Sequence, residues 1–182
     1  EAHGARPGPV VVSPSRATDA DRAPAHLNRD CRVVPQPDGN LGERLNAVDR
    51  ILRAADHQRL LFIGSDSPEL CADDYAAARS SLDEVDVVLG PATDGGVTLM
   101  GSTRPWPALG GLPWSTAQLG SALRNACEAQ GATVGEIAPR ADVDLATDLS
   151  RLARKLQGDT RPARQALLHW LTNFQARKAS VA

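Results

Sequence analysis

Short apolar runs alternate along this chain with segments that repeat apolar residues every three or four positions, and this alternation limits the possible folds. The runs are typical of buried strands and the periodic segments of amphipathic helices. Strands are predicted over 10–12, 32–35, 60–64, 85–90, 97–100 and 133–138. Helices are predicted over 17–28, 40–55, 71–82, 115–126, 146–156 and 163–177. This order predicts an α/β fold with a mostly parallel sheet and helices on both faces.

Local signals fix several of these boundaries. Asn40 followed by Glu43 predicts a variant of the capping box at the start of one helix. Ser115 with Gln118 predicts a second capping box. The turn at 93–96 predicts that the strand over 97–100 pairs back on its predecessor as a hairpin.

Composition narrows the class of protein. The chain has 182 residues and a formal net charge of −2, which suits one ordinary domain and argues against coating of nucleic acid. No apolar run approaches the roughly 20 residues that span a bilayer. The three cysteines form no C-x-x-C pair, which favours a reducing cytoplasm over a disulfide framework or zinc ribbon. We expect a loose lead-in at 1–9 and a single domain over 10–178, closed by helices at 150–178.

Ligands in such folds bind at the carboxyl ends of strands, so the residues after each strand are the candidates. In the segment 36–44, Gly39 and Gly42 allow close backbone approach, and a helix start attracts anions. Turn geometry explains these glycines equally well. Asp66 follows the strand over 60–64, where a carboxylate suits Mg²⁺ or Mn²⁺. A helix N-cap is the alternative for this segment.

Acidic residues also follow the later strands. Asp142 and Asp144 point the same way if the chain is extended there, and two neighbouring carboxylates favour a cation between them. Capping of the next helix is the alternative for Asp144. Asp94 suits a general base or an acceptor for a substrate hydroxyl, although Asp-Gly is also a turn signal. Trp114 offers an aromatic pocket wall or a buried core side chain.

The C-terminal stretch 151–178 carries seven basic residues against one acidic residue. No aromatic side chains interleave with the basic ones on that face. A solvated helix surface is therefore a better interpretation than RNA or DNA binding.

Five segments together resemble one family. They are QPDGNLGERL at 36–45, LFIGSDSPEL at 61–70, VDVVLGPATDGGVTLMG at 85–101, LPWST at 112–116 and DVDLATDL at 142–149. In this order they resemble the DUF2064 family of GT-A-like glycosyltransferases, over roughly residues 10–175. Each segment alone is unspecific, whereas the set is specific.

The resemblance implies a three-layer α/β/α GT-A fold and a nucleotide-sugar donor held through Mg²⁺ or Mn²⁺. It implies metal ligation by Asp66 and Asp144, with Asp142 as second choice. Asp94 is the implied base for a small-molecule acceptor. The implied nucleotide-binding residues are Gln36, Gly39, Asn40, Gly42 and Arg44. The implied substrate-binding residues are Asp94, Gly95, Gly96, Trp114 and Ser115.

Three departures from the family pattern stand out. The usual first strand and its basic phosphate-binding loop are not found in the sequence. Arg6-Pro7-Gly8 matches the pattern of that loop only weakly. The chain starts at Glu1, so either it lacks its natural N-terminus or it is a degenerate member. The family's D-G-G-Y ends here in Val97, and its D-x-D-T ends in Leu145.

Three functions stay open. The first is a metal-dependent glycosyltransferase. The second is a nucleotidyltransferase of the same fold, similar to the guanylyltransferases, although a triphosphate needs more cationic partners. The third is a non-catalytic protein that binds a donor or a partner. We expect no nucleic-acid or membrane partner and leave a homodimer open.

Overall fold

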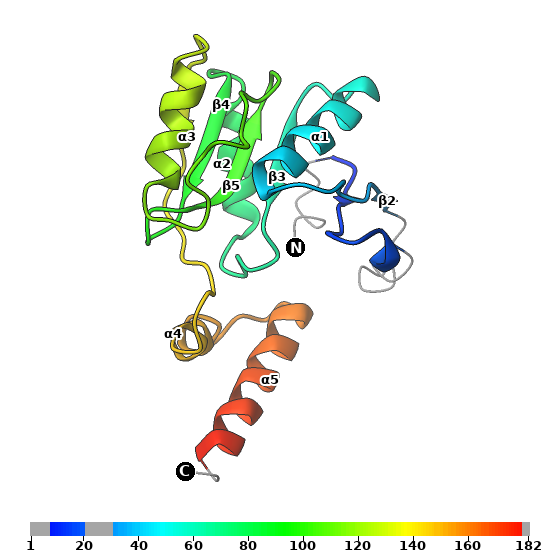
Figure 1. Cartoon of the computed structure of the whole chain (residues 1–182). Helices are drawn as coiled ribbons and strands as arrows, with labels where there is room; N and C mark the ends of the chain where they lie inside the picture. Colours follow the sequence, from blue (N-terminus) through cyan, green and yellow to red (C-terminus); the bar gives the residue numbers. More distant parts are fainter. Residues whose placement is uncertain (1–7, 21–30, 180–182) are drawn as a thin grey trace.

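The computed structural model describes residues 8–20 and 31–179 (Figure 1). Its elements in chain order are β1 (Val11–Val12), a 3₁₀ helix (Ala17–Asp19), β2 (Arg32–Val33), α1 (Leu41–Ala54), β3 (Leu60–Ile63), α2 (Ala72–Ser81), β4 (Val87–Pro91), β5 (Val97–Ser102), α3 (Leu119–Glu128), β6 (Val134–Glu136), α4 (Asp148–Lys155) and α5 (Pro162–Ala179). Three predicted features lie outside the described residues. They are the weak match to the basic loop at Arg6, most of the lead-in, and the second part of the helix predicted over 17–28.

The main sheet has the strand order β3-β5-β4-β6. Strand β5 is antiparallel to both of its neighbours, and β4 and β6 are parallel. Three of the four strands therefore run in one direction, and the prediction of a mostly parallel sheet is confirmed. The hairpin between β4 and β5 is also confirmed. A separate pair joins β1 and β2 in parallel.

Helices cover both faces of this sheet because side chains alternate along each strand. Val87 and Leu89 of β4 pack in the cluster that α3 covers through Leu123. Val88 points the other way and packs in the cluster that α2 covers through Ala78. Helix α1 lies on the same face as α3. The result is the predicted three-layer α/β/α arrangement (Figure 1).

The capping box at the start of α1 forms as predicted. The Asn40 side chain accepts a hydrogen bond from the Glu43 N–H at 3.0 Å, and the Glu43 carboxylate accepts one from the Asn40 N–H at 2.8 Å. Two N–H groups that the helix itself leaves without partners are thereby satisfied, which stabilises the helix by about 1 kcal/mol.

The capping box predicted at Ser115 does not form. Helix α3 begins at Leu119, and its N-cap residue, Gln118, makes no side-chain capping bond. Ser115 instead has a φ of 60° in the preceding loop. The physical reason is that the Gly120 N–H at the helix start donates to the carbonyl oxygen of Gly95, at 3.0 Å, so a distant turn supplies a partner.

Helices α4 and α5 have a small apolar core of their own, built on Leu152, Leu156 and Leu171. On the exposed side of α5, the rings of Trp170 and Phe174 stack with centroids 5.3 Å apart. Figure 1 shows both helices beyond the edge of the sheet at which β3, β4 and β6 end. Within residues 8–20 and 31–179, none of the helices has the length and apolar character needed to traverse a bilayer.

Candidate functional site

The carboxyl ends of β3, β4 and β6 meet at one edge of the sheet. Ile63 near the end of β3 and Gly90 near the end of β4 both pair with Leu99 of β5, so the two ends lie level. Strand β6 runs parallel to β4, and Leu89 pairs with Glu136 near the end of β6. The loops after these strands therefore emerge side by side, which is where open α/β sheets bind their ligands.

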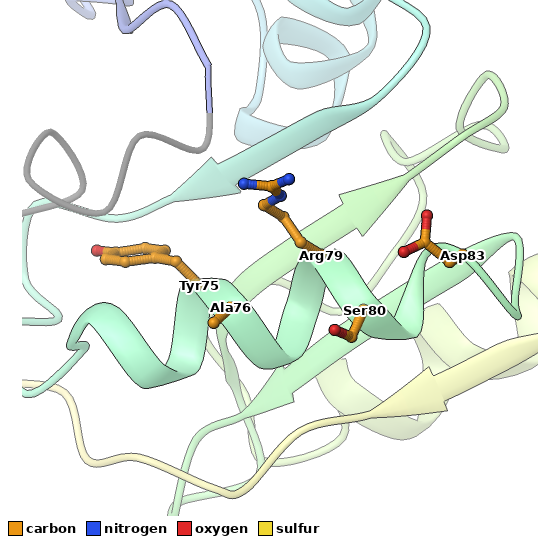
Figure 2. Close-up of a pocket in the computed structure, with 5 residues that line it drawn as sticks. All are labelled: Tyr75, Ala76, Arg79, Ser80 and Asp83. Carbon is orange, nitrogen blue, oxygen red and sulfur yellow. The ribbon is translucent and has the colours of Figure 1, made fainter.

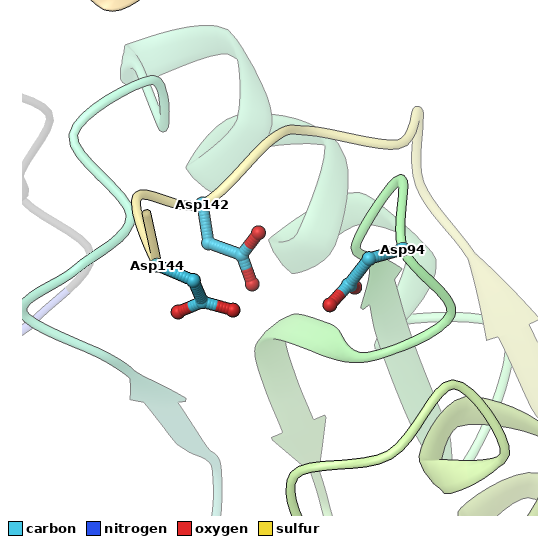
Figure 3. A group of neighbouring side chains, drawn as sticks. All are labelled: Asp94, Asp142 and Asp144. Carbon is cyan, nitrogen blue, oxygen red and sulfur yellow. The ribbon is translucent and has the colours of Figure 1, made fainter. Parts of the chain in front are cut away.

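Three carboxylates from two of these loops converge at that edge. Asp94 follows β4, and Asp142 and Asp144 follow β6; one oxygen from each lies within 4.8 Å of the other two. Figure 3 shows the carboxylates of Asp142 and Asp144 side by side, with the carboxylate of Asp94 facing them. Asp94 and Asp144 are exposed, whereas Asp142 is half-buried. The cluster is open to solvent on one side.

Asp66 lies beside this group rather than in it. Its backbone carbonyl accepts a hydrogen bond from the Val143 N–H at 3.0 Å, which joins the loop after β3 to the segment between Asp142 and Asp144. Its side chain turns back over Gly64, where a Cβ would meet the Asp66 Oδ1 at 2.2 Å. The sequence predicted Asp66 and Asp144 as the main pair. The structure brings Asp94, Asp142 and Asp144 closest together.

The electrostatics of the cluster appear in the pKa of Asp142. Burial raises the pKa of this carboxyl most, and the negative charges of Asp94, Asp144 and Asp66 raise it further. A hydrogen bond with its own backbone opposes the rise. Four carboxylates that repel one another in this way favour any bound cation.

The turn that presents Asp94 is held by short-range hydrogen bonds. Asp94 Oδ1 accepts from the Gly96 N–H at 2.9 Å, and the Gly95 N–H donates to the Ala92 carbonyl at 3.1 Å. Gly95 has a φ of 95°, which a residue with a Cβ rarely adopts. The turn interpretation of Asp-Gly is therefore correct, and the turn also aims the carboxylate at the other two.

Arg140 fixes the segment after β6 against the rest of the fold. Its backbone forms a bridge with Ala92, and its N–H donates to the Pro91 carbonyl at 3.0 Å. Its guanidinium donates to both carboxylate oxygens of Asp74, whose side chain is 3% exposed. Sequence reasoning missed this pair because it joins positions 66 residues apart.

The predicted nucleotide-binding residues around the start of α1 contact the loop before Trp114. The Asn40 Nδ2 donates to the Gly110 carbonyl at 3.0 Å. Gly42 is buried, and a Cβ there would meet the Leu109 carbonyl oxygen at 2.1 Å. Close packing thus explains Gly42, as turn geometry explains Gly39 with its φ of 125°.

Two further residues of this group carry buried polar atoms that have no hydrogen-bond partner among the described residues. They are the Oε1 of Gln36 and the Nε of Arg44. Gln36 is anchored from its other side, since its Nε2 donates to the Ser13 carbonyl at 2.7 Å. Leaving such an atom unpaired costs about 1 to 3 kcal/mol, so a ligand that supplied a partner would recover that free energy.

The predicted substrate-binding residues after β5 are held by the loop they belong to. The Trp114 indole N–H donates to the Leu109 carbonyl at 2.8 Å, and the ring packs against the core between the sheet and α3. This matches the alternative of a core tryptophan. Ser115 is exposed directly after it. Gly95 and Gly96 lie in the Asp94 turn described above.

The C-terminal helices contact the acidic edge through basic side chains that sequence reasoning placed in solvent. Arg151 of α4 donates to the Asp142 carbonyl and to the Glu69 carboxylate. Arg164 of α5 is buried and donates to the Leu70 carbonyl. The interpretation of a wholly solvated basic face is therefore wrong for these two residues, since both bond to residues far away in the chain.

A separate pocket of about 190 Å³ lies along α2. Figure 2 shows its lining residues along α2 and just beyond the end of this helix. They are Tyr75, Ala76, Arg79, Ser80 and Asp83. None of the predicted site residues is among them.

Comparison with known proteins gave one family and one fold. The model of a family described as "Uncharacterized protein conserved in bacteria (DUF2064)" matches residues 2–116. A crystal structure named as a "putative nucleotide-diphospho-sugar transferase" from Desulfovibrio desulfuricans G20 is similar, with a TM-score of 0.78 and 24% identity. The match covers 89% of this chain and 73% of that one. A search of curated proteins found no match.

Proposed function

The chain belongs to the family of bacterial proteins described as DUF2064, and on that premise we propose that it transfers a sugar from a nucleotide-diphospho-sugar to a small-molecule acceptor with Mg²⁺ or Mn²⁺. The fold is that of the solved structure named as a nucleotide-diphospho-sugar transferase. The name of that protein supplies the class of donor. Its residues, at 24% identity, supply no roles.

One observation carries the proposal: oxygen atoms of Asp94, Asp142 and Asp144 lie within 4.8 Å of one another at the ligand-binding edge of the sheet. The donor set is purely carboxylate, which Mg²⁺ and Mn²⁺ prefer over the imidazole and thiolate ligands of zinc. Oxygens on opposite sides of Mg²⁺ are about 4.2 Å apart, so small side-chain rotations fit the Asp142 and Asp144 oxygens to the ion, and Asp94 lies beside them. Asp66 adds a fourth carboxylate beside it.

Such a metal would neutralise the charge that develops on the leaving diphosphate. In our proposal Asp142 and Asp144 hold it, and Asp66, whose negative charge acts on Asp142, adds to the attraction for the cation. The nucleotide would lie toward the start of α1, where Gln36 and Arg44 offer buried polar atoms without partners among the described residues.

Asp94 has the position of a base for the acceptor. It faces the metal pair from the opposite side, and among the described residues a hydrogen bond from the Gly96 N–H engages one of its oxygens, Oδ1. Its second oxygen can accept the proton of an attacking hydroxyl. We place the sugar and the acceptor between Asp94 and the exposed Ser115. Trp114 fixes the loop that precedes Ser115 through its hydrogen bond to the Leu109 carbonyl.

The cellular setting belongs to the same proposal. Cys31, Cys71 and Cys127 are free, which suits a reducing compartment such as the cytoplasm. The partners we propose are the nucleotide-sugar donor and a small acceptor.

Calorimetry with UDP-, GDP- and dTDP-sugars, and separately with nucleoside triphosphates, tests the proposal with and without Mn²⁺. We expect binding of one nucleotide sugar that depends on Mn²⁺ and is lost in Asp142→Asn and Asp144→Asn. Asp83→Asn is the matched control, because this exposed acid lies just beyond the end of α2 and forms an ion pair with Arg59.

The alternatives give different results. Binding of triphosphates alone would indicate a nucleotidyltransferase, for which the fold is equally suited. Binding of neither class would indicate a non-catalytic protein. Either result overturns the proposal.

A further inference from the structure

Arg151 bonds both to the segment that carries Asp66 and to the segment that carries Asp142 and Asp144. It lies on α4, outside the sheet. One guanidinium nitrogen donates to the Glu69 carboxylate at 2.9 Å, three residues beyond Asp66. The other donates to the Asp142 backbone carbonyl at 2.7 Å.

The two hydrogen bonds of Arg151, one to Glu69 and one to the Asp142 carbonyl, connect the two segments. Glu69 is 10% exposed, so its charge is largely removed from water and depends on its partner. The guanidinium is a rigid planar fork, which fixes the distance between the two groups it holds. It also lies 3.6 Å from Asp148, whose carboxylate accepts the N–H groups of Asp144 and Leu145.

Between these anchors lies the backbone hydrogen bond from the Val143 N–H to the Asp66 carbonyl, which joins the two segments. Without Arg151, that bond and the packing of Val143 against α4 and α5 would have to hold the segments together. Arg164 supports the same loop further along through the Leu70 carbonyl. The C-terminal helices thus reach the acidic edge mainly through arginine side chains.

We propose that Arg151 is a positioning residue that sets the spacing between Asp66 and the Asp142–Asp144 pair, so that helix α4 prepares the cation site. It acts through the Glu69 carboxylate and the Asp142 carbonyl and does not itself touch the cation. The role in cation binding rests on the proposed function. The joining of the two segments does not.

The test compares Arg151→Met with Arg154→Met, because Arg154 is an exposed arginine on the same helix. The first readout is the rate of amide hydrogen exchange at Val143, which NMR measures in the absence of metal. The second is the affinity for Mn²⁺, measured by titration of the metal alone.

Arg151→Met is expected to speed exchange at Val143 about tenfold or more, because two charge-assisted hydrogen bonds are lost. Exchange at Ile137, whose N–H bonds to Leu89 in the sheet, is expected to stay unchanged. The Mn²⁺ affinity is expected to fall about tenfold or more, the usual effect of removing a group that orients metal ligands. Arg154→Met should change neither readout.

A second variant, Glu69→Gln, removes the charge from one arm of the bridge but keeps an acceptor oxygen, and it should speed Val143 exchange less than Arg151→Met does. Combined with Arg151→Met it should add little, because both changes break the same contact. If Arg151→Met does not fold, Arg151→Lys replaces it. This variant keeps a charge near Glu69 but lacks the fork, and the same selective rise at Val143 is expected.

The inference is overturned if Arg151→Met matches Arg154→Met, or if exchange at Val143 and Ile137 rises equally, since that would be general loosening. It is also overturned if Mn²⁺ affinity falls without a change at Val143. If the unaltered protein binds no Mn²⁺ at all, the cation site fails, and the exchange comparison alone decides whether Arg151 joins the segments.

Discussion

The ion pair between Asp74 and Arg140 gives the sharpest prediction on stability. The Asp74 carboxylate is 3% exposed and accepts three hydrogen bonds from Arg140, at 2.8 to 3.1 Å. It also accepts the Cys71 N–H at 2.9 Å. Breaking a buried pair by removing one partner costs about 3 to 5 kcal/mol. Arg140 is 28% exposed, so water can partly replace its lost partner.

Asp74→Asn is therefore expected to lower the free energy of unfolding by about 2 to 3 kcal/mol, since the amide keeps one acceptor. For a chain of this size that corresponds to a fall in Tm of about 4 to 12 °C. Urea unfolding followed by tryptophan fluorescence measures the change. Asp73→Asn is the matched control, because Asp73 is exposed in the same first turn of α2.

The pH dependence of this difference is a second check on the same variant. Burial alone would raise the pKa of Asp74, but the hydrogen bonds from Arg140 and Cys71 prevail and lower it below its ordinary value of 3.8. A carboxyl with a lowered folded pKa stabilises above its unfolded pKa and loses that contribution as pH falls through the folded value. The gap between Asp74→Asn and the unaltered protein should therefore be full at pH 7 and shrink below about pH 4.

Two results would refute this reasoning. One is a loss of stability in Asp74→Asn no larger than that in Asp73→Asn. The other is a gap that stays constant as the pH falls, because the charge of Asp74 would then contribute nothing.

Three further predictions follow from single contacts. Gly42→Ala is expected to lower the free energy of unfolding by about 1 to 3 kcal/mol and to shift the fluorescence of Trp114, because the new Cβ would meet the Leu109 oxygen at 2.1 Å. Gly111→Ala is the control, because a Cβ at Gly111 would meet no atom within 4 Å. Equal stability of the two variants would contradict the close packing at Gly42. Burial raises the pKa of the Cys127 thiol to about 11, so mass spectrometry after iodoacetamide treatment at pH 8 should find Cys71 alkylated before Cys127, and the reverse order would be inconsistent with that burial. Burial and then the charges of Asp94, Asp144 and Asp66 raise the pKa of Asp142. Mn²⁺ binds the carboxylate form of an aspartate. Calorimetry at decreasing pH should therefore show the affinity of the protein for Mn²⁺ beginning to fall at a higher pH than it would with a ligand of ordinary aspartate pKa. An affinity independent of pH down to 4 would exclude Asp142 as a ligand.

Much of the fold could be predicted because the signals are local. The apolar runs that became β3 and β4, and the capping box at Asn40, depend on residues within a few positions. The hairpin of β4 and β5 was likewise predicted from its turn. The insertion of β5 between β3 and β4 was not, because strand order depends on pairing between distant segments.

The candidate site divides in the same way. Acidic residues after strands could be found from the sequence, since the ends of parallel strands share an edge. The sequence did not show which of them meet. The contact of Asp94 with Asp142 and Asp144 depends on the bridge between Ala92 and Arg140.

The arginines were the largest omission. Arg151 belongs to a run of basic residues that normally faces solvent, and its partner Glu69 lies 82 positions earlier. No periodicity in the chain marks this contact. A buried carboxylate without a local partner is the only signal, and it is visible only once the fold is known.

Anomalous diffraction from crystals soaked in Mn²⁺ tests the central claim most directly, since it locates the ion without assuming a donor. We predict one peak within coordination distance of carboxylate oxygens of Asp142 and Asp144, on the side facing Asp94. A peak elsewhere, or none at this edge while Mn²⁺ is bound in solution, would contradict the account.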